Sequence, residues 1–289
     1  MESVKNSLVK SAQKQTFSAF MSTEGMKKKV NEMVGGKNGQ QFITSIISAV
    51  STNPGLAECD NATIISAALL GQSLKLSPSP QLGQYYMVPF KDSKRGCKVA
   101  QFQLGYKGYI QLAVRSGFYK KLNVLAIKEG ELVKYDPLSE ELEVKLIEDE
   151  EERENAPTIG YYAMFEYLNG FKKTLYWSKK KMEAHAEKYS MGYKAKKGYT
   201  FWEKDFDAMA YKTMLRQLIS KWGIMSIDMQ TAMESDMAEI KEDGTYEYLD
   251  TEPIDIQEET TIVENAPVET QEEDQIQNEN VQEDDPFLK

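Results

Sequence analysis

The sequence predicts an α+β fold with a central antiparallel or mixed sheet, built from hairpins that pack against helices. Two turn sequences carry this prediction, because strand-like residues flank each of them: Asp92–Gly96, with a basic tip, and Asn169-Gly170, a strong hairpin dipeptide. Stretches with apolar residues at helical spacing precede and follow the hairpins. The predicted hairpin strands are residues 84–90 with 97–103, and residues 158–168 with 171–177.

The N-terminal part of the chain is expected to be helical. Residues 16–34 carry apolar side chains at helical spacing until Gly35–Gly39 interrupts them. Two further apolar helices are expected over residues 41–50 and 61–76, the second capped by Asp60. These helices serve as scaffold or as a subunit interface, and the sequence does not choose between the two.

Gly35-Gly36-Lys37 invites comparison with a phosphate-binding loop. That motif needs a glycine five positions before the second glycine and a hydroxyl after the lysine, where this chain has Asn31 and Asn38. The sequence therefore predicts no nucleotide cradle here.

A helix is predicted over residues 106–116, opened by Gly105 and closed by Gly117. Positions four apart share one face of a helix, so its polar line should be exposed and its apolar positions should face the core. The outward set is Lys107, Gln111 and Arg115, and the inward set is Ile110, Ala113 and Val114.

The next segment is expected to contain strands over residues 122–128 and 131–135. An acidic stretch over residues 136–154 follows, with ten acids and only Lys145 and Arg153 as bases, and it is expected to be an exposed, mobile loop.

Helices are predicted again after the second hairpin. Ser178 should cap a helix over residues 179–189, in which the single histidine, His185, packs or lies on the surface. A mobile basic loop is expected over residues 191–200, and the longest helix over residues 201–222. Lys204, Lys212 and Arg216 form a second basic line on that helix.

Charge is segregated along the chain. The net formal charge is −10, from 45 acidic and 35 basic residues, but Asp236–Lys289 holds nineteen of the acids and only two lysines. The rest of the chain therefore carries 26 acids against 33 bases, a net charge of +7. A basic body with an acidic, disordered end is the asymmetry expected of a nucleic-acid-binding protein.

The two cysteines, Cys59 and Cys97, show no C-x-x-C spacing. We expect free thiols in a reducing compartment rather than a disulfide framework or a zinc site. The sequence shows no apolar stretch long enough to cross a bilayer, and we expect a cytosolic protein.

The most informative stretch runs from Leu69 to Lys121. It places eight aromatic residues among Lys and Arg side chains and holds a single acid, Asp92. Cations neutralise phosphates and release counterions, while rings stack on bases of any identity, so this mixture suits single-stranded DNA. A half-buried sheet has a similar composition, but the arrangement on a basic hairpin and a striped helix favours the nucleic-acid interpretation.

Two segments of this stretch, LSPSPQLGQYYMVPF at residues 76–90 and FQLGYKGYIQLAVRSG at residues 102–117, closely resemble the signature of the RecT family of phage single-strand DNA annealing recombinases. The resemblance extends more loosely over residues 17–225. It implies binding of single-stranded DNA and ATP-independent annealing to a complementary strand, in phage or prophage homologous recombination in the cytoplasm of a bacterial host. It also implies a homo-oligomer, as a ring or helical filament, with a phage exonuclease and the host single-stranded DNA-binding protein as partners.

We therefore expect a helical arm (residues 1–34), a core for DNA binding, annealing and oligomerisation (35–235) and a disordered acidic tail (236–289). Annealing requires no covalent step, so no catalytic residue, cofactor or metal is expected. Tyr106, Tyr109 and Trp202 either stack on bases or pack in the core. The candidate DNA-binding residues are Lys94, Arg95, Lys98, Gln103, Tyr106, Lys107, Tyr109, Gln111, Arg115, Lys120, Lys121, Trp202, Lys212 and Arg216.

Three alternative functions stay open. The chain could be a binding module for single-stranded nucleic acid without annealing activity. A metal-dependent nuclease would draw on Glu203, Asp205 and Asp207, but residues two apart on a helix do not share a face. A sequence-specific RNA module would use Gly105–Gly108 as a GXXG loop; here that motif follows a strand, whereas in KH domains it joins two helices.

Overall fold

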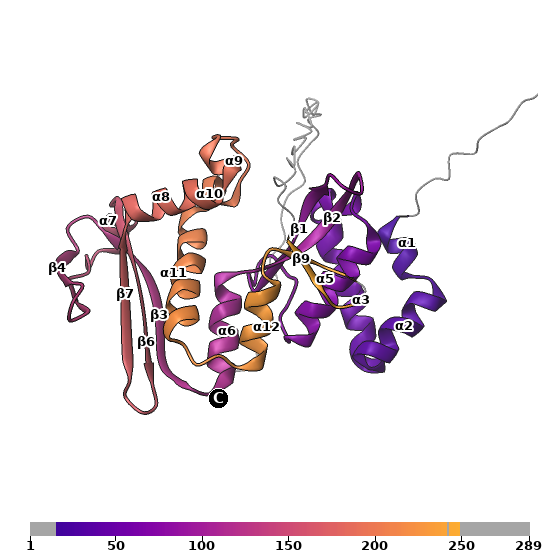
Figure 1. Ribbon diagram of the computed structural model, residues 1–289, viewed down its shortest axis with the longest axis horizontal. Helices are drawn as coiled ribbons and strands as arrows, with labels where there is room; N and C mark the ends of the chain where they lie inside the picture. Colours follow the sequence, from indigo (N-terminus) through magenta and orange to yellow (C-terminus); the bar gives the residue numbers. More distant parts are fainter. Residues whose placement is uncertain (1–15, 242, 249–289) are drawn as a thin grey trace, which may run out of the picture. The chain divides into compact units, whose positions relative to one another are not determined.

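The computed structural model describes residues 16–241 and 243–248. Within them the predicted α+β class is confirmed, with antiparallel sheets and a helical N-terminal region (Figure 1). No helix in this part of the chain is long and apolar enough to cross a membrane. The helices are α1 (Phe17–Met21), α2 (Glu24–Val34), α3 (Gly36–Ser51), α4 (Pro54–Ala57), α5 (Asn61–Ser73), α6 (Tyr106–Ser116), α7 (Glu150–Asn155), α8 (Lys179–Tyr189), α9 (Met191–Lys194), α10 (Phe201–Lys204), α11 (Phe206–Trp222) and α12 (Ile227–Ser235). The strands are β1 (Tyr85–Asp92), β2 (Cys97–Leu104), β3 (Tyr119–Lys128), β4 (Leu132–Asp136), β5 (Glu141–Val144), β6 (Thr158–Tyr167), β7 (Lys172–Ser178), β8 (Ala238–Ile240) and β9 (Tyr246–Tyr248).

Helix caps divide the N-terminal segment more finely than the sequence predicted. The Thr23 hydroxyl accepts a hydrogen bond from the Met26 amide (3.4 Å), so α2 starts anew after α1 and the single helix predicted over residues 16–34 is two. Gly35, at φ 89°, ends α2, but α3 begins at the next residue rather than at residue 41. Asp60 caps α5 as predicted, because its carboxylate accepts from the Ala62 amide (3.0 Å).

The first sheet has the strand order β1-β2-β8-β9. β1 and β2 form the predicted hairpin, paired in register through residues 85–92 and 97–104. Helix α5 packs against it: Tyr85 stacks on Phe102 with ring centroids 5.0 Å apart, and an added Cβ on Gly71 would come within 2.2 Å of the Tyr85 ring. Buried side chains from α1 to α5, β1, β2, α6, α11 and α12 form one hydrophobic cluster around this sheet.

The segment assigned to the acidic tail begins with folded residues. Strand β8 pairs with β2, with Phe102 opposite Ala238, and β9 pairs with β8. Strands of three residues are too short for apolar periodicity to reveal them. Residues 249–289, the remainder of the predicted disordered tail, lie outside the described residues, as do residues 1–15 of the predicted arm.

The second sheet has the strand order β3-β6-β7. β6 and β7 form the second predicted hairpin, with Gly170 at φ 86° in its turn. β4 pairs with β5 in a sheet of their own, so the hairpins fall in separate sheets instead of one central sheet. Helices α8 and α11 pack against the second sheet over a hydrophobic cluster that includes Tyr161, Phe165 and Met214.

The acidic stretch over residues 136–154 contains strand β5 and helix α7, where a loop was predicted. Asp149 caps α7 by accepting from the Glu152 amide (2.8 Å). Glu131 fixes this segment to the rest of the fold. Its buried carboxylate accepts hydrogen bonds from Arg153 Nε (2.6 Å) and from the Ile147 amide (3.3 Å). These contacts join positions far apart in the sequence, which is why local composition did not reveal them.

The helix predicted over residues 201–222 is broken at Asp205. Its carboxylate accepts from the Ala208 amide (3.0 Å) and caps α11, so α10 ends one residue earlier. Ser178 caps α8 as predicted, and His185 packs between the rings of Trp177 (5.4 Å between centroids) and Tyr189 (4.5 Å).

Candidate nucleic-acid interface

Glycines set the position of helix α6 against the loop that precedes β1. The Gly105 amide donates to the Gln84 carbonyl (2.9 Å), and an added Cβ on Gly105 would lie 2.1 Å from the Gly83 carbonyl oxygen. An added Cβ on Gly108 would likewise lie 2.1 Å from the Gln84 carbonyl oxygen. The Gln84 side chain in turn accepts from the Ser77 amide (2.7 Å). Only glycine allows this approach, so the sequence around these residues fixes the first turn of α6 against the loop.

The outward face of α6 carries the predicted polar line. Lys107, Gln111 and Arg115 are exposed, as predicted, and among the described residues Lys107 forms no ion pair. Arg115 is already engaged, because its guanidinium donates to the carbonyls of Leu74 (2.5 Å) and Lys75 (3.3 Å) beyond the end of α5. Val114 was predicted to face the core but is 61% exposed.

Cations at the tip of the β1–β2 hairpin are held by acids. Arg95 Nε donates to Asp92 (2.5 Å) and its Nη2 donates to Glu239 of β8. This hydrogen bond from Arg95 lowers the pKa of the Asp92 carboxyl below its ordinary value. Lys94 reaches Glu247 at 3.4 Å from an exposed position, and Lys98 pairs with Glu58.

Two further predicted contacts meet at a buried carboxylate. Asp236 accepts from Lys212 Nζ (2.9 Å), from Arg216 Nη1 (2.7 Å) and from the Leu104 amide (2.9 Å). Lys212 is itself buried, while Arg216 is partly exposed. The second basic line predicted on α11 therefore does not form one exposed stripe, because Lys212 is buried against Asp236, an acid distant in the sequence.

The remaining polar candidates lie on strands. Lys120 and Lys121 at the start of β3 are exposed and share Glu166 of β6, at 2.5 Å and 3.6 Å. Exposed pairs of this kind contribute little to stability, so their ammonium groups can exchange one anion for another. Gln103 is half-buried on β2, opposite Tyr86 of β1.

The three aromatic candidates differ in exposure. Tyr109 and Trp202 are buried, which leaves no ring face for a base to stack on. Tyr106 is half-buried, with its ring edge-on to Tyr211 at 5.5 Å between centroids. Of the alternatives left open for these residues, packing in the core fits Tyr109 and Trp202.

The acids considered for a nuclease have structural partners. Glu203 completes a capping box, accepting from the Thr200 hydroxyl (2.7 Å), and Asp205 caps α11. Asp207 accepts from the Tyr161 hydroxyl (2.5 Å). Within the described residues no group of three or more His, Cys, Asp or Glu side chains is placed to hold a metal ion.

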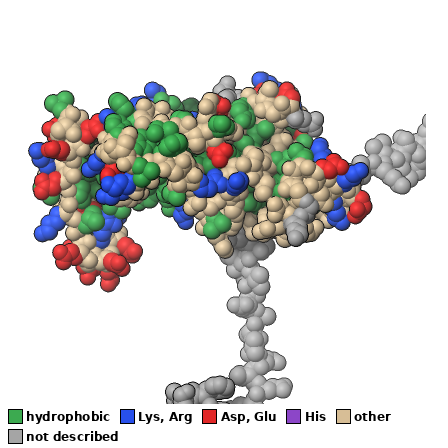
Figure 2. All heavy atoms as spheres, turned by 90° about the horizontal axis from the view of Figure 1, so that it is seen from below, with side chains coloured by type: hydrophobic (Ala, Val, Ile, Leu, Met, Phe, Trp, Pro, Cys, Tyr) green, Lys and Arg blue, Asp and Glu red, His purple; other side chains and the backbone are tan. Residues whose placement is uncertain are grey.

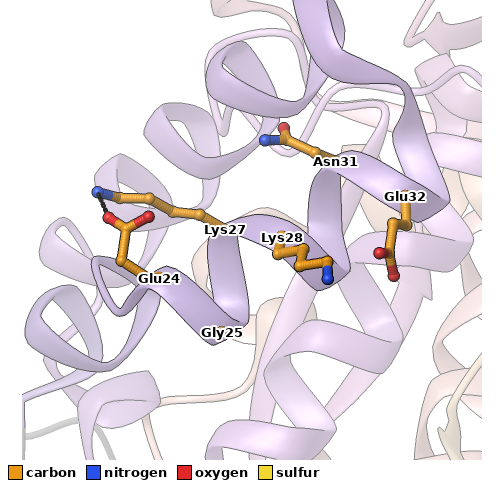
Figure 3. A pocket seen from close by; sticks show the side chains of 6 residues that line it. All are labelled: Glu24, Gly25, Lys27, Lys28, Asn31 and Glu32. Carbon is orange, nitrogen blue, oxygen red and sulfur yellow. Dashed lines mark hydrogen bonds and ion pairs between the residues drawn. The ribbon is translucent and has the colours of Figure 1, made fainter.

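Figure 3 shows a pocket of about 660 Å³ that is not a candidate binding site. All of its lining residues, from Glu24 to Glu32, belong to helix α2, and Lys27 is paired with Glu24 (3.2 Å). A single exposed helix brings no groups together from different elements. The surface around α6 remains the better candidate.

Comparison with known proteins identifies the family. The model of the RecT family matches residues 40–248, and a relative from Escherichia coli strain K12, Protein RecT, is 31% identical over 69% of this chain and 72% of its own length. The chain belongs to the RecT family. A second relative, the uncharacterized protein YqaK of Bacillus subtilis strain 168, is 40% identical over 99% of this chain and 93% of its own length. Membership of the RecT family supports a general role in DNA recombination and strand annealing.

The RecT-family match includes α6 and extends through β8 and β9. Both strands therefore belong to the region shared with the family, which agrees with the pairing of β8 to β2 and of β9 to β8. Helices α1 and α2 lie outside the match.

Two aromatic side chains in this region, Tyr86 and Phe201, were not among the candidate DNA-binding residues, although Tyr86 was one of the eight rings noted in residues 69–121. Tyr86 is half-buried, its ring centroid lies 6.1 Å from that of Phe201, and Phe201 is 44% exposed. An added Cβ on Gly83 would lie 3.0 Å from the Tyr86 hydroxyl and 3.4 Å from Lys107 Cδ, which places Tyr86 and Lys107 together, while Phe201 joins them through Tyr86. Phe201 follows a basic loop, and this was the sequence signal available, but its proximity to Tyr86 depends on the tertiary fold.

Proposed function

We propose that this RecT-family chain binds single-stranded DNA along the exposed face of α6 and anneals it to a complementary strand without ATP, working as an oligomer. The observation that carries the proposal is that Lys107 lies beside Tyr86, both within the family signature, and that the exposed Phe201 ring lies against Tyr86. A cation with neighbouring rings is what binding to a backbone and its bases requires, whatever the sequence.

Within this proposal the candidate residues take different roles. Lys107 and Gln111 contact the backbone directly, and Tyr86, Tyr106 and Phe201 offer ring surface. Lys94, Lys98, Lys120 and Lys121 exchange an exposed carboxylate for phosphate, an exchange that costs little at the surface.

The other candidates position these groups. Arg115 anchors α6 to the end of α5, and Arg95 anchors the hairpin to β8. Lys212 and Arg216 fix Asp236 against β2, and the buried rings of Tyr109 and Trp202 support the helices.

Annealing by this surface needs no covalent step. Neutralising phosphates lowers the repulsion between two strands, and holding one strand extended keeps it free of hairpins. Duplex formation then supplies the free energy. A phage exonuclease that produces single strands and the host single-stranded DNA-binding protein that covers them are the partners this role requires.

The test is the annealing of two complementary oligonucleotides without any nucleotide, followed by the quenching of a fluorophore pair. The full chain should accelerate annealing strongly over the uncatalysed rate, and Lys107→Ala should slow it. A chain that binds the oligonucleotides but leaves the annealing rate unchanged is a binding module, and the proposed function is then wrong. Magnesium-dependent cleavage of the strands would point to the nuclease instead.

A further inference from the structure

Large apolar side chains are exposed together at one end of the three-stranded sheet. They come from the β6–β7 turn, from the connection between α6 and β3, and from the connection between α11 and α12. Figure 2 shows hydrophobic side chains gathered over this part of the molecule. We name it the apolar end; its residues are Phe118, Leu168, Phe171, Trp222, Ile224 and Ile227.

Hydrogen bonds and a cation–π contact join the three connections into one surface. The Leu168 amide donates to the Phe118 carbonyl (3.3 Å). The Tyr167 hydroxyl accepts from the Ile224 amide (2.5 Å), and the Lys173 ammonium lies 3.6 Å from the centre of the Trp222 ring. Ile227 is nevertheless 84% exposed and Leu168 72% exposed. Exposed apolar side chains that lie together and are fixed in place mark an interaction site more often than scattered single ones do.

The rim of the apolar end is basic. The lysines exposed around it are Lys120, Lys121, Lys172 and Lys221, and they outnumber the nearby acids. Those acids are Glu166, which Lys120 and Lys121 share, the exposed Asp228 beside Ile227, and Glu140, which pairs with Lys173. The charge calls for an occupant that is acidic as well as apolar.

Such a segment lies at the opposite end of the same sheet. Helix α7 and the residues before it expose acids together with the apolar Leu146, and Figure 2 shows acidic side chains projecting apart from the hydrophobic area. Strand β6 separates the two surfaces, and its ten residues span about 30 Å. The acids of this segment are Glu148, Asp149, Glu150, Glu151, Glu152 and Glu154.

We infer that the apolar end binds the α7 segment of a second copy of this chain. The distance along β6 prevents the two surfaces of one copy from meeting, while their charges and apolar character are complementary. The two surfaces differ, so a pair of chains joined by this contact still has one free apolar end and one free α7 segment. Further copies can bind to these, and the assembly grows head to tail. This inference rests on the oligomer in the proposed function and names the contact that builds it.

Sedimentation velocity of the full chain over a range of concentrations tests the contact. Leu168→Ser/Ile227→Ser and Glu151→Lys/Glu154→Lys should each raise the dissociation constant for self-association at least about tenfold. The matched control is Met33→Ser, on helix α2, which removes a 56% exposed methionine outside both surfaces and should leave self-association unchanged. All substituted positions are exposed, and circular dichroism checks that each variant is folded.

Mixing the two defective variants distinguishes this contact from others. Each retains one intact surface, so the mixture should form pairs of unlike chains and nothing larger. Reversing both sides in one chain, with Lys172→Glu/Lys221→Glu added to Glu151→Lys/Glu154→Lys, should restore assembly.

Two results would overturn the inference. Assembly like that of wild type in Leu168→Ser/Ile227→Ser would show that the apolar end is not an interface. Normal assembly in Glu151→Lys/Glu154→Lys alone would assign the apolar end to another acidic segment, such as residues 249–289. A wild-type chain that assembles but does not anneal would refute the proposed function and leave the contact standing.

Discussion

At the scale of single residues, Asp236 is a buried acid that joins several elements of the fold. It is fully buried and joins α11, β2 and the residues leading to β8 through Lys212, Arg216 and the Leu104 amide. A carboxylate at 0% exposure is stable only because cations and an amide surround it. Two of the cations that the sequence assigned to DNA, Lys212 and Arg216, are therefore part of the fold.

Replacing this carboxylate should be costly. Asp236→Asn leaves the buried Lys212 ammonium without a counter-ion and should lower the free energy of unfolding by about 3 kcal/mol or more. Urea denaturation measures the change, with Asp228→Asn on the exposed side of α12 as the control. A loss below about 1 kcal/mol, the usual range for surface pairs, would contradict the role given to Asp236.

Asp92 should make stability depend on pH. The hydrogen bond from Arg95 lowers its pKa in the folded state, so its contribution is full above the ordinary carboxyl pKa of about 4 and disappears as pH falls through the lower folded value. Asp92→Asn should therefore be less stable than wild type at pH 7, and the gap should shrink below about pH 4. Unfolding of both proteins across this range measures the gap, and a gap independent of pH would reject the assignment.

At the scale of elements, the placement of α6 is the feature on which the candidate interface depends. The loop before β1 lies directly against its first turn, and the glycines there leave no room for a side chain. The exposed line from Lys107 to Arg115 is presented at a fixed angle to the first sheet for that reason.

Gly105→Ala should disturb this arrangement. The added Cβ would come within 2.1 Å of the Gly83 carbonyl, so the loop must shift, and we expect a loss of about 1–3 kcal/mol in stability together with weaker DNA binding. Gly25→Ala in α2 is the matched control, because nothing lies within 4 Å of its added Cβ and helix propensity favours alanine. Calorimetry that finds the two variants equally stable would count against the close packing.

Elements with local signals were predictable from sequence, and those that depend on distant partners were not. The predicted turn and cap residues each lie at the turn or helix end where they were predicted: Asn169-Gly170, Gly105, Gly117, Asp60 and Ser178. The break at Asp205 could have been predicted only by recognising that Asp205 caps α11 instead of continuing the helix. The position of β8 in the fold depends on the ion pairs of Asp236 with Lys212 and Arg216, and no local sequence pattern predicts these contacts.

At the scale of the whole molecule, charge separates the chain into a basic part and an acidic end. The described residues extend to Tyr248, and residues 249–289 carry fourteen acids and one lysine. We expect an acidic segment of this charge to compete with DNA for basic surface at low salt.

Truncation after Tyr248 tests that competition. It removes the acidic end, retains β8 and β9, and should tighten binding of single-stranded DNA at low salt while leaving stability unchanged. A truncation before Asp236 also removes the carboxylate of the buried cluster and should unfold the protein. Unchanged affinity in the first variant would eliminate the acidic end as a competitor.

The salt dependence of single-stranded DNA binding by Lys107→Ala is the most direct test of the α6 interface. If Lys107 contacts a phosphate, its loss should weaken binding and reduce the slope of log K against log salt by about 0.7. Lys29→Ala, an exposed lysine of α2 outside the RecT-family match, should change neither quantity. Identical slopes and affinities for wild type and Lys107→Ala would mean that DNA binds elsewhere on this protein.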